Sequence, residues 1–148
     1  MIREIDNLRE ISRLCLGQEP LSDDLAQWLG QSLDAFLNQR CRTLYEAFEL
    51  RTGRGGVPWY TEEAMRARDA ALRGLADLHF AHLSISARSK KIATMCLRYA
   101  GSAWRFDSER SEMPDGYRST AKEFIWRAFK SRAVMPVGER QLRNILAC

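Results

Sequence analysis

The chain has 148 residues, 45% hydrophobic and 28% charged, which is ordinary for one soluble globular domain and too short for two. No apolar run approaches the roughly 20 residues of a membrane span, and the N-terminus is charged throughout, so we expect a protein that is neither exported nor membrane-spanning. Four scattered cysteines without ligand spacing indicate thiols in a reducing cytoplasm and argue against a structural zinc site.

The net charge of +4 conceals an asymmetry along the chain. Residues 1–50 carry 5 basic and 9 acidic groups, residues 51–100 carry 9 and 4, and residues 101–148 carry 9 and 6. An acidic first third and a basic remainder fit a basic surface for a polyanion, or two parts that attract each other within or between chains. Arginine outnumbers lysine 19 to 4, a usage typical of GC-rich bacterial coding.

Apolar residues at helical spacing begin near the N-terminus and continue to residue 50. Residues 2–16 predict a short amphipathic helix that needs to dock on the rest of the protein. Its apolar positions are Ile5, Leu8, Ile11 and either Cys15 or Leu16. Ser22 is a natural N-cap for the next helix, whose wide apolar face includes Trp28 and Phe36. A shorter helix is expected over residues 43–50.

A glycine-rich loop, RTGRGGVPWY over residues 51–60, then interrupts the helices. Arg51, Arg54 and Trp59 supply groups that bind phosphates and stack on bases. The loop does not match a P-loop, because no Gly-Lys followed by Ser or Thr comes after the glycines. Two interpretations stay open, a connector between helices with its aromatics in the core and a loop that binds directly.

Thr61 is expected to cap a helix that runs from Glu62 to about His82. Near its end, His79 and His82 lie three residues apart and close to Asp77. No third or fourth ligand is identifiable and the HExxH pattern is absent, so we predict ordinary histidines and no bound metal or other cofactor.

The longest helical pattern covers residues 84–110, and we expect the other elements to pack along it. Its apolar stripe consists of Ile92, Met95, Cys96, Tyr99, Ala103 and Phe106. One edge of the stripe carries Arg88, Lys91, Arg98 and Arg105, the last three at seven-residue spacing. This row fits the backbone of a nucleic acid or, alternatively, the basic border of a core. Gly101 predicts close packing, because glycine costs about 1 kcal/mol relative to alanine in a helix.

Two more helices are expected after the turn at residues 114–116. The capping box over residues 120–123 begins a helix that ends near Arg132, and residues 139–147 form the last helix. The outer face of the last helix carries Arg140, Gln141, Arg143 and Asn144. This layout is typical of a helix-turn-helix, whose second helix reads the major groove. The turn from Ala133 to Gly138 is longer than the usual three or four residues, so an ordinary packed hairpin is the alternative.

The sequence therefore predicts an all-α, single-domain bundle of six or seven helices over residues 1–148, organised around the helix from Ser84 to Arg110. It contains no GxSxG motif and no glycine fingerprint after a strand, so we expect no enzyme. We expect a cytoplasmic accessory or regulatory protein that binds nucleic acid. The candidate residues are Arg51, Arg54, Trp59, Arg88, Lys91, Arg98, Arg105, Arg140, Gln141, Arg143 and Asn144. The alternative is a helical interaction module or homo-oligomer, anchored by Trp104 or Trp126.

Overall fold

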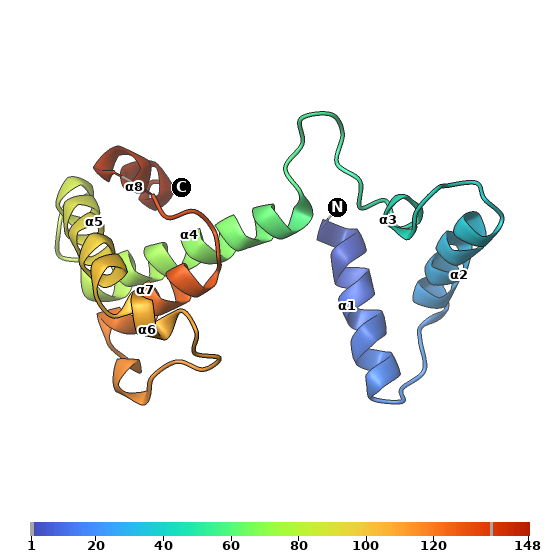
Figure 1. Ribbon diagram of the computed structural model, residues 1–148, viewed down its shortest axis with the longest axis horizontal. Helices are drawn as coiled ribbons and strands as arrows, with labels where there is room; N and C mark the ends of the chain where they lie inside the picture. The colour runs from blue at the N-terminus through green and yellow to red at the C-terminus, as the bar shows by residue number, and fades with distance from the viewer. Residues whose placement is uncertain (1, 137) are drawn as a thin grey trace. The chain divides into compact units, whose positions relative to one another are not determined.

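The computed structural model describes residues 2–136 and 138–148, in which all regular structure is helical and no strand occurs (Figure 1). The predicted all-α class is confirmed. Contacts between residues gather in two compact units, Met1–Trp59 and Tyr60–Cys148, called here the N-terminal and the C-terminal unit. Each unit is described by itself, and the single domain stays a prediction. No helix of the described residues is long and apolar enough to cross a bilayer.

The N-terminal unit contains α1 (Ile2–Leu16), α2 (Asp23–Leu37) and α3 (Leu44–Ala47). The predicted cap of α2 forms, because Ser22 Oγ accepts a hydrogen bond from the N–H of Leu25. Thr43, predicted as the first residue of the next helix, is instead the N-cap of α3, and its Oγ1 accepts a hydrogen bond from the N–H of Glu46. α2 packs against α3, and the rings of Trp28 and Phe48 lie 5.4 Å apart.

The buried face of α1 differs from the predicted one at its C-terminal end. Ile5 and Ile11 are buried as expected, but the third buried residue is Leu14. Cys15 and Leu16 are exposed, because Leu14 follows Ile11 by one helical step of three residues and takes the inward position. The last turn of α1 therefore presents its apolar side chain at position 16 to solvent.

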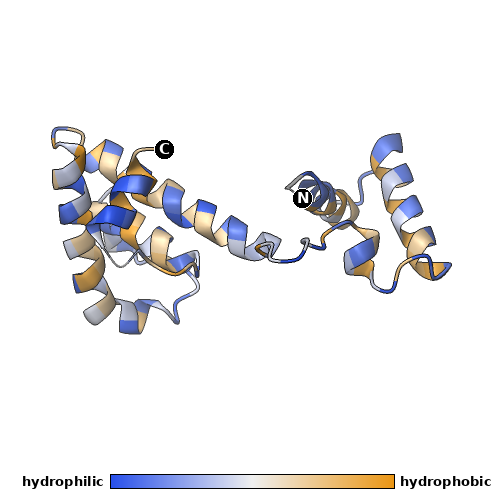
Figure 2. Ribbon diagram, turned by 90° about the horizontal axis from the view of Figure 1, so that it is seen from above, coloured by the Kyte–Doolittle hydropathy of each residue, from blue (hydrophilic) through white to orange (hydrophobic). Residues whose placement is uncertain are grey.

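In the described part of the C-terminal unit, five α-helices and one 3₁₀ helix surround a common core. They are α4 (Trp59–His79), α5 (Ile85–Gly101), α6 (Trp104–Asp107), η1 (Asp115–Tyr117), α7 (Ala121–Lys130) and α8 (Glu139–Leu146). The core holds fully buried side chains from four of them, namely Leu72, Leu75, Ile92, Ile125 and Leu142. Figure 2 shows hydrophobic and hydrophilic residues alternating along the helical turns, as expected for helices that each bury one face.

The helix predicted over residues 84–110 is divided in two. α5 begins after Ser84, whose Oγ accepts a hydrogen bond from the N–H of Ala87, but it ends at Gly101, and α6 starts only at Trp104. The local sequence explains the break, because glycine is a poor helix former and the hydroxyl of Ser102 donates a hydrogen bond of 2.6 Å to the carbonyl of Arg98. The change of direction leaves Phe106 73% exposed, whereas it was predicted in the core.

The longest helix of the described residues is α4, with 21 residues. It begins at Trp59, two residues before Thr61, so Thr61 is not its N-cap. It also contains the glycine at which two helices approach closely. A Cβ atom on Gly74 would lie 2.7 Å from Cε1 of Phe124 on α7, while a Cβ on Gly101 would meet nothing within 4 Å. The packing role predicted for Gly101 is therefore wrong, since position 101 is exposed.

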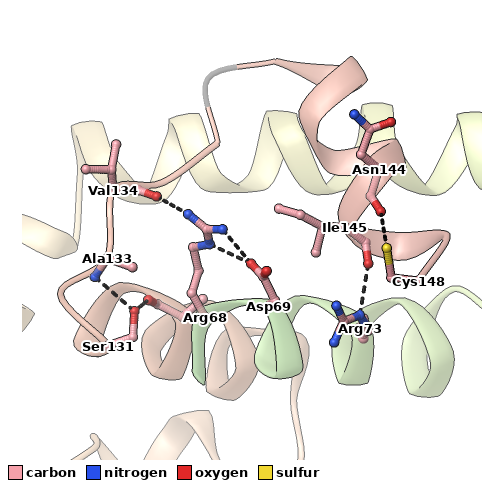
Figure 3. Close-up of polar contacts among 10 residues, drawn as sticks. Arg68, Asp69, Arg73, Ser131, Ala133, Val134, Asn144, Ile145 and Cys148 are labelled. Atoms are coloured by element: carbon pink, nitrogen blue, oxygen red, sulfur yellow. Dashed lines mark hydrogen bonds and ion pairs between the residues drawn. The ribbon is translucent and has the colours of Figure 1, made fainter. Parts of the chain in front are cut away.

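The C-terminal segment is attached to α4 by two arginines (Figure 3). The guanidinium of Arg68 donates to the carbonyl of Val134 and pairs with Asp69. Nε of Arg73 donates a hydrogen bond of 2.9 Å to the carbonyl of Ile145, in the last turn of α8. These contacts join residues 66 and 72 positions apart in the sequence and position α8 on the core.

Among the described residues, four α-helices are followed, two residues after their last helical residue, by a non-glycine residue with positive φ. These residues are Gln18 after α1, Gln39 after α2, Glu49 after α3 and Arg132 after α7, with φ between 55° and 64°. At the end of α2 the N–H of Gln39 donates to the carbonyl of Phe36 and the N–H of Arg40 to that of Ala35. The left-handed residue thus satisfies carbonyl groups that the helix end would leave without partners.

Candidate nucleic-acid interface

Positive charge is concentrated in the C-terminal unit. Its residues 60–148 include 16 basic and 10 acidic side chains, a net charge of +6, whereas residues 1–59 include 7 and 9, a net charge of −2. Many of these arginines are paired with carboxylates nearby on the same helix, such as Arg66 with Glu62 and Arg127 with Glu123. The cations that remain unpaired are the ones available to a polyanion.

The solvent-exposed side of α5 carries three cations. None of them can pair with a carboxylate of the same helix, because the 17 residues of α5 include no Asp or Glu. Lys90 and Arg98 are exposed, and neither has an ion-pair partner among the described residues. The ammonium of Lys91 lies 5.1 Å from the ring centroid of Phe80, an arrangement that leaves its charge unneutralised.

α8 carries the second group of exposed polar residues. Leu142 is fully buried and fixes the inner face of the helix, and the helix packs mainly on α5. The predicted residues Arg140, Gln141, Arg143 and Asn144 are all exposed on the rest of its surface. In the part of the chain that the structure describes, neither arginine has an ion-pair partner.

α6 adds a cation and an aromatic ring that follow each other in the sequence. Arg105 is exposed and donates a hydrogen bond of 3.3 Å to the carbonyl of Gly101, and Phe106 is exposed next to it. The sequence pattern assigned Phe106 to the core because it assumed an unbroken helix. The Gly101-Ser102 pair was the signal that could have shown the break, and with it the exposed ring.

The side chain of Arg88 is hydrogen-bonded to the loop between α4 and α5. Its Nε donates to the carbonyl of Leu83 at 2.9 Å, its Nη2 donates to the carbonyl of Ala81 at 2.7 Å, and its Nη1 lies 3.6 Å from Oδ1 of Asp77. The side chain is half-buried. The structure therefore gives Arg88 a local structural role, while Lys91 and Arg98 on the same helix keep their charges in solvent.

The glycine-rich loop belongs to the N-terminal unit and covers residues 51–58, since α4 begins at Trp59. Arg51 forms an ion pair with Glu46 of α3. Arg54 is exposed at the turn, and Trp59 is half-buried. The structure thus places these three predicted residues in a different unit from those on α5, α6 and α8.

The connection between α7 and α8 determines how α8 is presented. α7 ends at Lys130 and α8 begins at Glu139, so eight residues separate them. α8 packs mainly on α5 and is held on α4 by Arg73. α8 therefore owes its position to α4 and α5, and not to the short turn that joins the two helices of a helix-turn-helix.

A buried polar cluster that the sequence analysis missed holds α6 in place. Asp107 is only 4% exposed, and its Oδ2 accepts hydrogen bonds of 2.8 Å from the hydroxyls of both Tyr99 and Tyr117. Nε of Arg110 lies 3.4 Å from the other carboxylate oxygen. Burial, together with the adjacent carboxylate, raises the pKa of Tyr99 and of Tyr117 above the ordinary value. The cluster joins α5, α6 and η1 and so fixes the segment that carries Arg105 and Phe106.

The two indole rings considered as anchors for a partner lie against the body of the unit. Trp104 is half-buried, 5.2 Å from Phe129 and 6.0 Å from Tyr99 by ring centroids. Trp126 is also half-buried. The ammonium of Lys130 lies 6.0 Å from the first ring and 5.6 Å from the second. Both rings thus contribute mainly to packing within the C-terminal unit.

Other reactive side chains are part of the packing. His79 stacks edge-on against Phe124 at 5.7 Å, and His82 is exposed. Burial raises the pKa of the Cys96 thiol to about 11, so this cysteine stays protonated at neutral pH. No group of three metal-ligating side chains comes together in the described residues.

Comparisons with known protein families, with curated proteins and with solved structures find no match to this chain.

Proposed function

We propose that this chain is a cytoplasmic bacterial protein that binds nucleic acid through the exposed sides of α5, α6 and α8. This basic surface consists of Lys90, Lys91, Arg98, Arg105, Arg140 and Arg143. The observation that carries the proposal is the contrast between two kinds of cation in one unit. Arg66 and Arg127 are neutralised by carboxylates, while Lys90, Arg98, Arg140 and Arg143 have no acidic partner in the described ranges.

Unpaired cations on neighbouring helices are suited to phosphates, because each contact releases a counterion from the nucleic acid. α5 and α8 pack on each other, so their cations lie on adjacent elements. Gln141 and Asn144 on α8 can donate hydrogen bonds to base edges and accept hydrogen bonds from them. The same contacts were expected of this helix when it was predicted as the recognition helix of a helix-turn-helix. Phe106 supplies a face on which an unpaired base can stack.

Binding is tested by fluorescence anisotropy with a labelled random duplex and a labelled single strand over a series of salt concentrations. We expect an affinity that falls steeply with salt, with a log–log slope of about −3 to −5 if four to six phosphates are contacted. A preference for the single strand that is lost in Phe106→Ala would assign stacking to this ring. Loss of affinity for the duplex in Asn144→Ala would instead support groove reading by α8.

The matched variants are two double substitutions that remove the same charge. Arg98→Ala with Arg140→Ala removes unpaired cations, and we expect the slope to fall by about 2 and the binding to weaken by at least about tenfold. Arg66→Ala with Arg127→Ala removes paired cations of the same unit, and we expect little change. Equal weakening by both doubles, or no binding at low salt, would reject the basic surface.

A further inference from the structure

α2 carries a second apolar stripe beside the face that it packs against α3. The stripe consists of Ala26, Gly30, Leu33 and Leu37, whose spacing of four, three and four residues is that of a coiled-coil seam. All four are exposed, Leu33 by 38% and Leu37 by 74%. A Cβ atom on Gly30 would meet nothing within 4 Å, so the chain itself leaves this position open.

A groove of about 500 Å³ continues the stripe beyond the end of the helix. It is lined by Phe36, Leu37, Gln39, Cys41 and Arg42. Apolar side chains and a guanidinium therefore meet at the C-terminal end of α2, while Asp23 and Asp24 lie at its N-terminal end. The two ends of one helix thus differ in both charge and side-chain size.

We propose that this stripe is the interface for a second copy of the same chain, with the two α2 helices antiparallel. Antiparallel pairing centred between Gly30 and Leu33 places Leu37 of each copy opposite Ala26 of the other, and Leu33 opposite Gly30. Large residues then fill the space above small ones, as knobs fill holes. In a parallel pair, Leu33 and Leu37 of one copy would instead lie beside the same leucines of the other, and a gap would remain between the two Gly30 residues.

Charge selects the same arrangement. In the antiparallel pair, Asp23 and Asp24 of one copy approach Arg40 and Arg42 of the other, next to the groove. Arg40 forms an ion pair with Asp34 of its own chain, whereas Arg42 has no ion-pair partner among the described residues, so the attraction comes mainly from Arg42. A parallel pair would bring four aspartates together, which like-charge repulsion disfavours. The antiparallel contact is self-complementary, as a twofold symmetric dimer requires.

The first test is sedimentation equilibrium on the full chain and on two variants that add one lysine each. Gly30→Lys places the charge on the stripe. The monomer is expected to keep its fold, because the new side chain enters open space and lysine is a better helix former than glycine. Gln31→Lys places the same charge on an exposed position about 100° around the helix. We expect dimers with a dissociation constant on the order of micromolar for the wild type and for Gln31→Lys, and at least about a tenfold weaker dimer for Gly30→Lys.

The second test fixes the direction of the pair by charge reversal. Asp23→Lys with Asp24→Lys sets cations against cations in a homodimer, and Arg40→Glu with Arg42→Glu sets anions against anions. Each variant alone is expected to dimerise at least about tenfold more weakly than the wild type. An equimolar mixture restores attraction at both contacts, so we expect it to form heterodimers. Circular dichroism spectra matching that of the wild type establish that each variant is folded.

Several results would overturn the proposal. A wild type that stays monomeric throughout the concentration range excludes a second copy as the occupant of the stripe. A dimer that is unaffected by Gly30→Lys lies on another surface. A mixture of the charge-reversed variants that does not recover dimers excludes the antiparallel arrangement. None of these outcomes depends on nucleic-acid binding by the C-terminal unit, so each proposal can be rejected without affecting the other.

Discussion

The hydroxyl of Tyr99 donates a hydrogen bond of 2.8 Å to the buried carboxylate of Asp107, eight residues further along the chain. Tyr117 donates to the same oxygen from η1. Because a buried carboxylate is stable only with such donors, this cluster links the fold of α6 to two other elements. It also positions the segment that carries Arg105 and Phe106, which belong to the proposed interface.

Removing the acceptor is expected to destabilise the protein more than removing either donor. Asp107→Ala leaves the Tyr99 hydroxyl buried without a partner, and we expect it to lower the free energy of unfolding by about 1 to 3 kcal/mol. Tyr99→Phe should cost about 1 kcal/mol, and Tyr117→Phe less, because Tyr117 is half-buried and its hydroxyl can bond to water. Urea denaturation followed by circular dichroism measures all three. An Asp107→Ala protein with an unchanged midpoint would contradict a structural role for the cluster.

The same cluster makes the protein sensitive to alkaline pH. The pKa of Tyr99 and that of Tyr117 are raised in the folded protein, so above the unfolded value of about 10 the folded state binds more protons than the unfolded state. The corresponding stability is fully present below about pH 10 and is lost as the pH rises further. Urea midpoints at increasing alkaline pH should therefore fall, and should fall less steeply for Tyr99→Phe. Parallel curves for both proteins would disagree with this linkage.

Gly74→Ala is expected to destabilise the protein although alanine is the better helix former. The new Cβ atom would lie 2.7 Å from the ring of Phe124, which is held between His79 and Arg127. We expect a net cost of about 1 to 3 kcal/mol in thermal or urea unfolding. Gly101→Ala is the control, since its Cβ atom meets nothing, and it should be neutral or stabilising. Recovery of stability in Gly74→Ala with Phe124→Leu would confirm that the ring is the obstacle.

The attachment of α8 is expected to depend on Arg73. Arg73→Ala removes the donor to the carbonyl of Ile145, and we expect faster hydrogen exchange in residues 139–148 with little change in α5. Arg66→Ala, which removes an exposed ion pair on the same helix, should leave the exchange of α8 unchanged. Equal protection of α8 in the two variants would show that the apolar packing of Leu142, Ile145 and Leu146 is sufficient to hold it.

Local signals in the sequence predicted the helical class and most helix starts. Ser22 caps the helix that it was expected to cap. Thr43 and Ser84, the residues at which two other helices were predicted to begin, are the N-caps of α3 and α5, because a hydroxyl before an amphipathic run needs no distant partner. The capping box at Thr120 forms only in part. Glu123 accepts from the N–H of Ser119, but the hydroxyl of Thr120 donates to the carbonyl of Tyr117 and does not cap α7.

The structural features that could not be predicted from the sequence depend on contacts between residues that are distant in the chain. The break after Gly101 is stabilised by Asp107 and its tyrosines, and the roles of Arg73 and Arg88 depend on carbonyl groups that only the folded chain brings near. Among the candidate residues, the exposure of Arg98, Arg140 and Arg143 followed from helical spacing alone. Helical spacing could not predict that Arg88 hydrogen-bonds to a loop, because spacing does not determine the hydrogen-bond partners of a long side chain.

The non-glycine residues that end α1, α2, α3 and α7 have a practical consequence for engineering. A side chain with a Cβ atom in the left-handed conformation costs roughly 1 kcal/mol more than glycine. The chain therefore forgoes stability at Gln18, Gln39, Glu49 and Arg132, four positions that lie outside both the core and the basic surface. Glycine at Gln18, Glu49 and Arg132 would give a more heat-resistant form of the protein with its helices, its charges on α5 and α8, and the stripe on α2 unaltered.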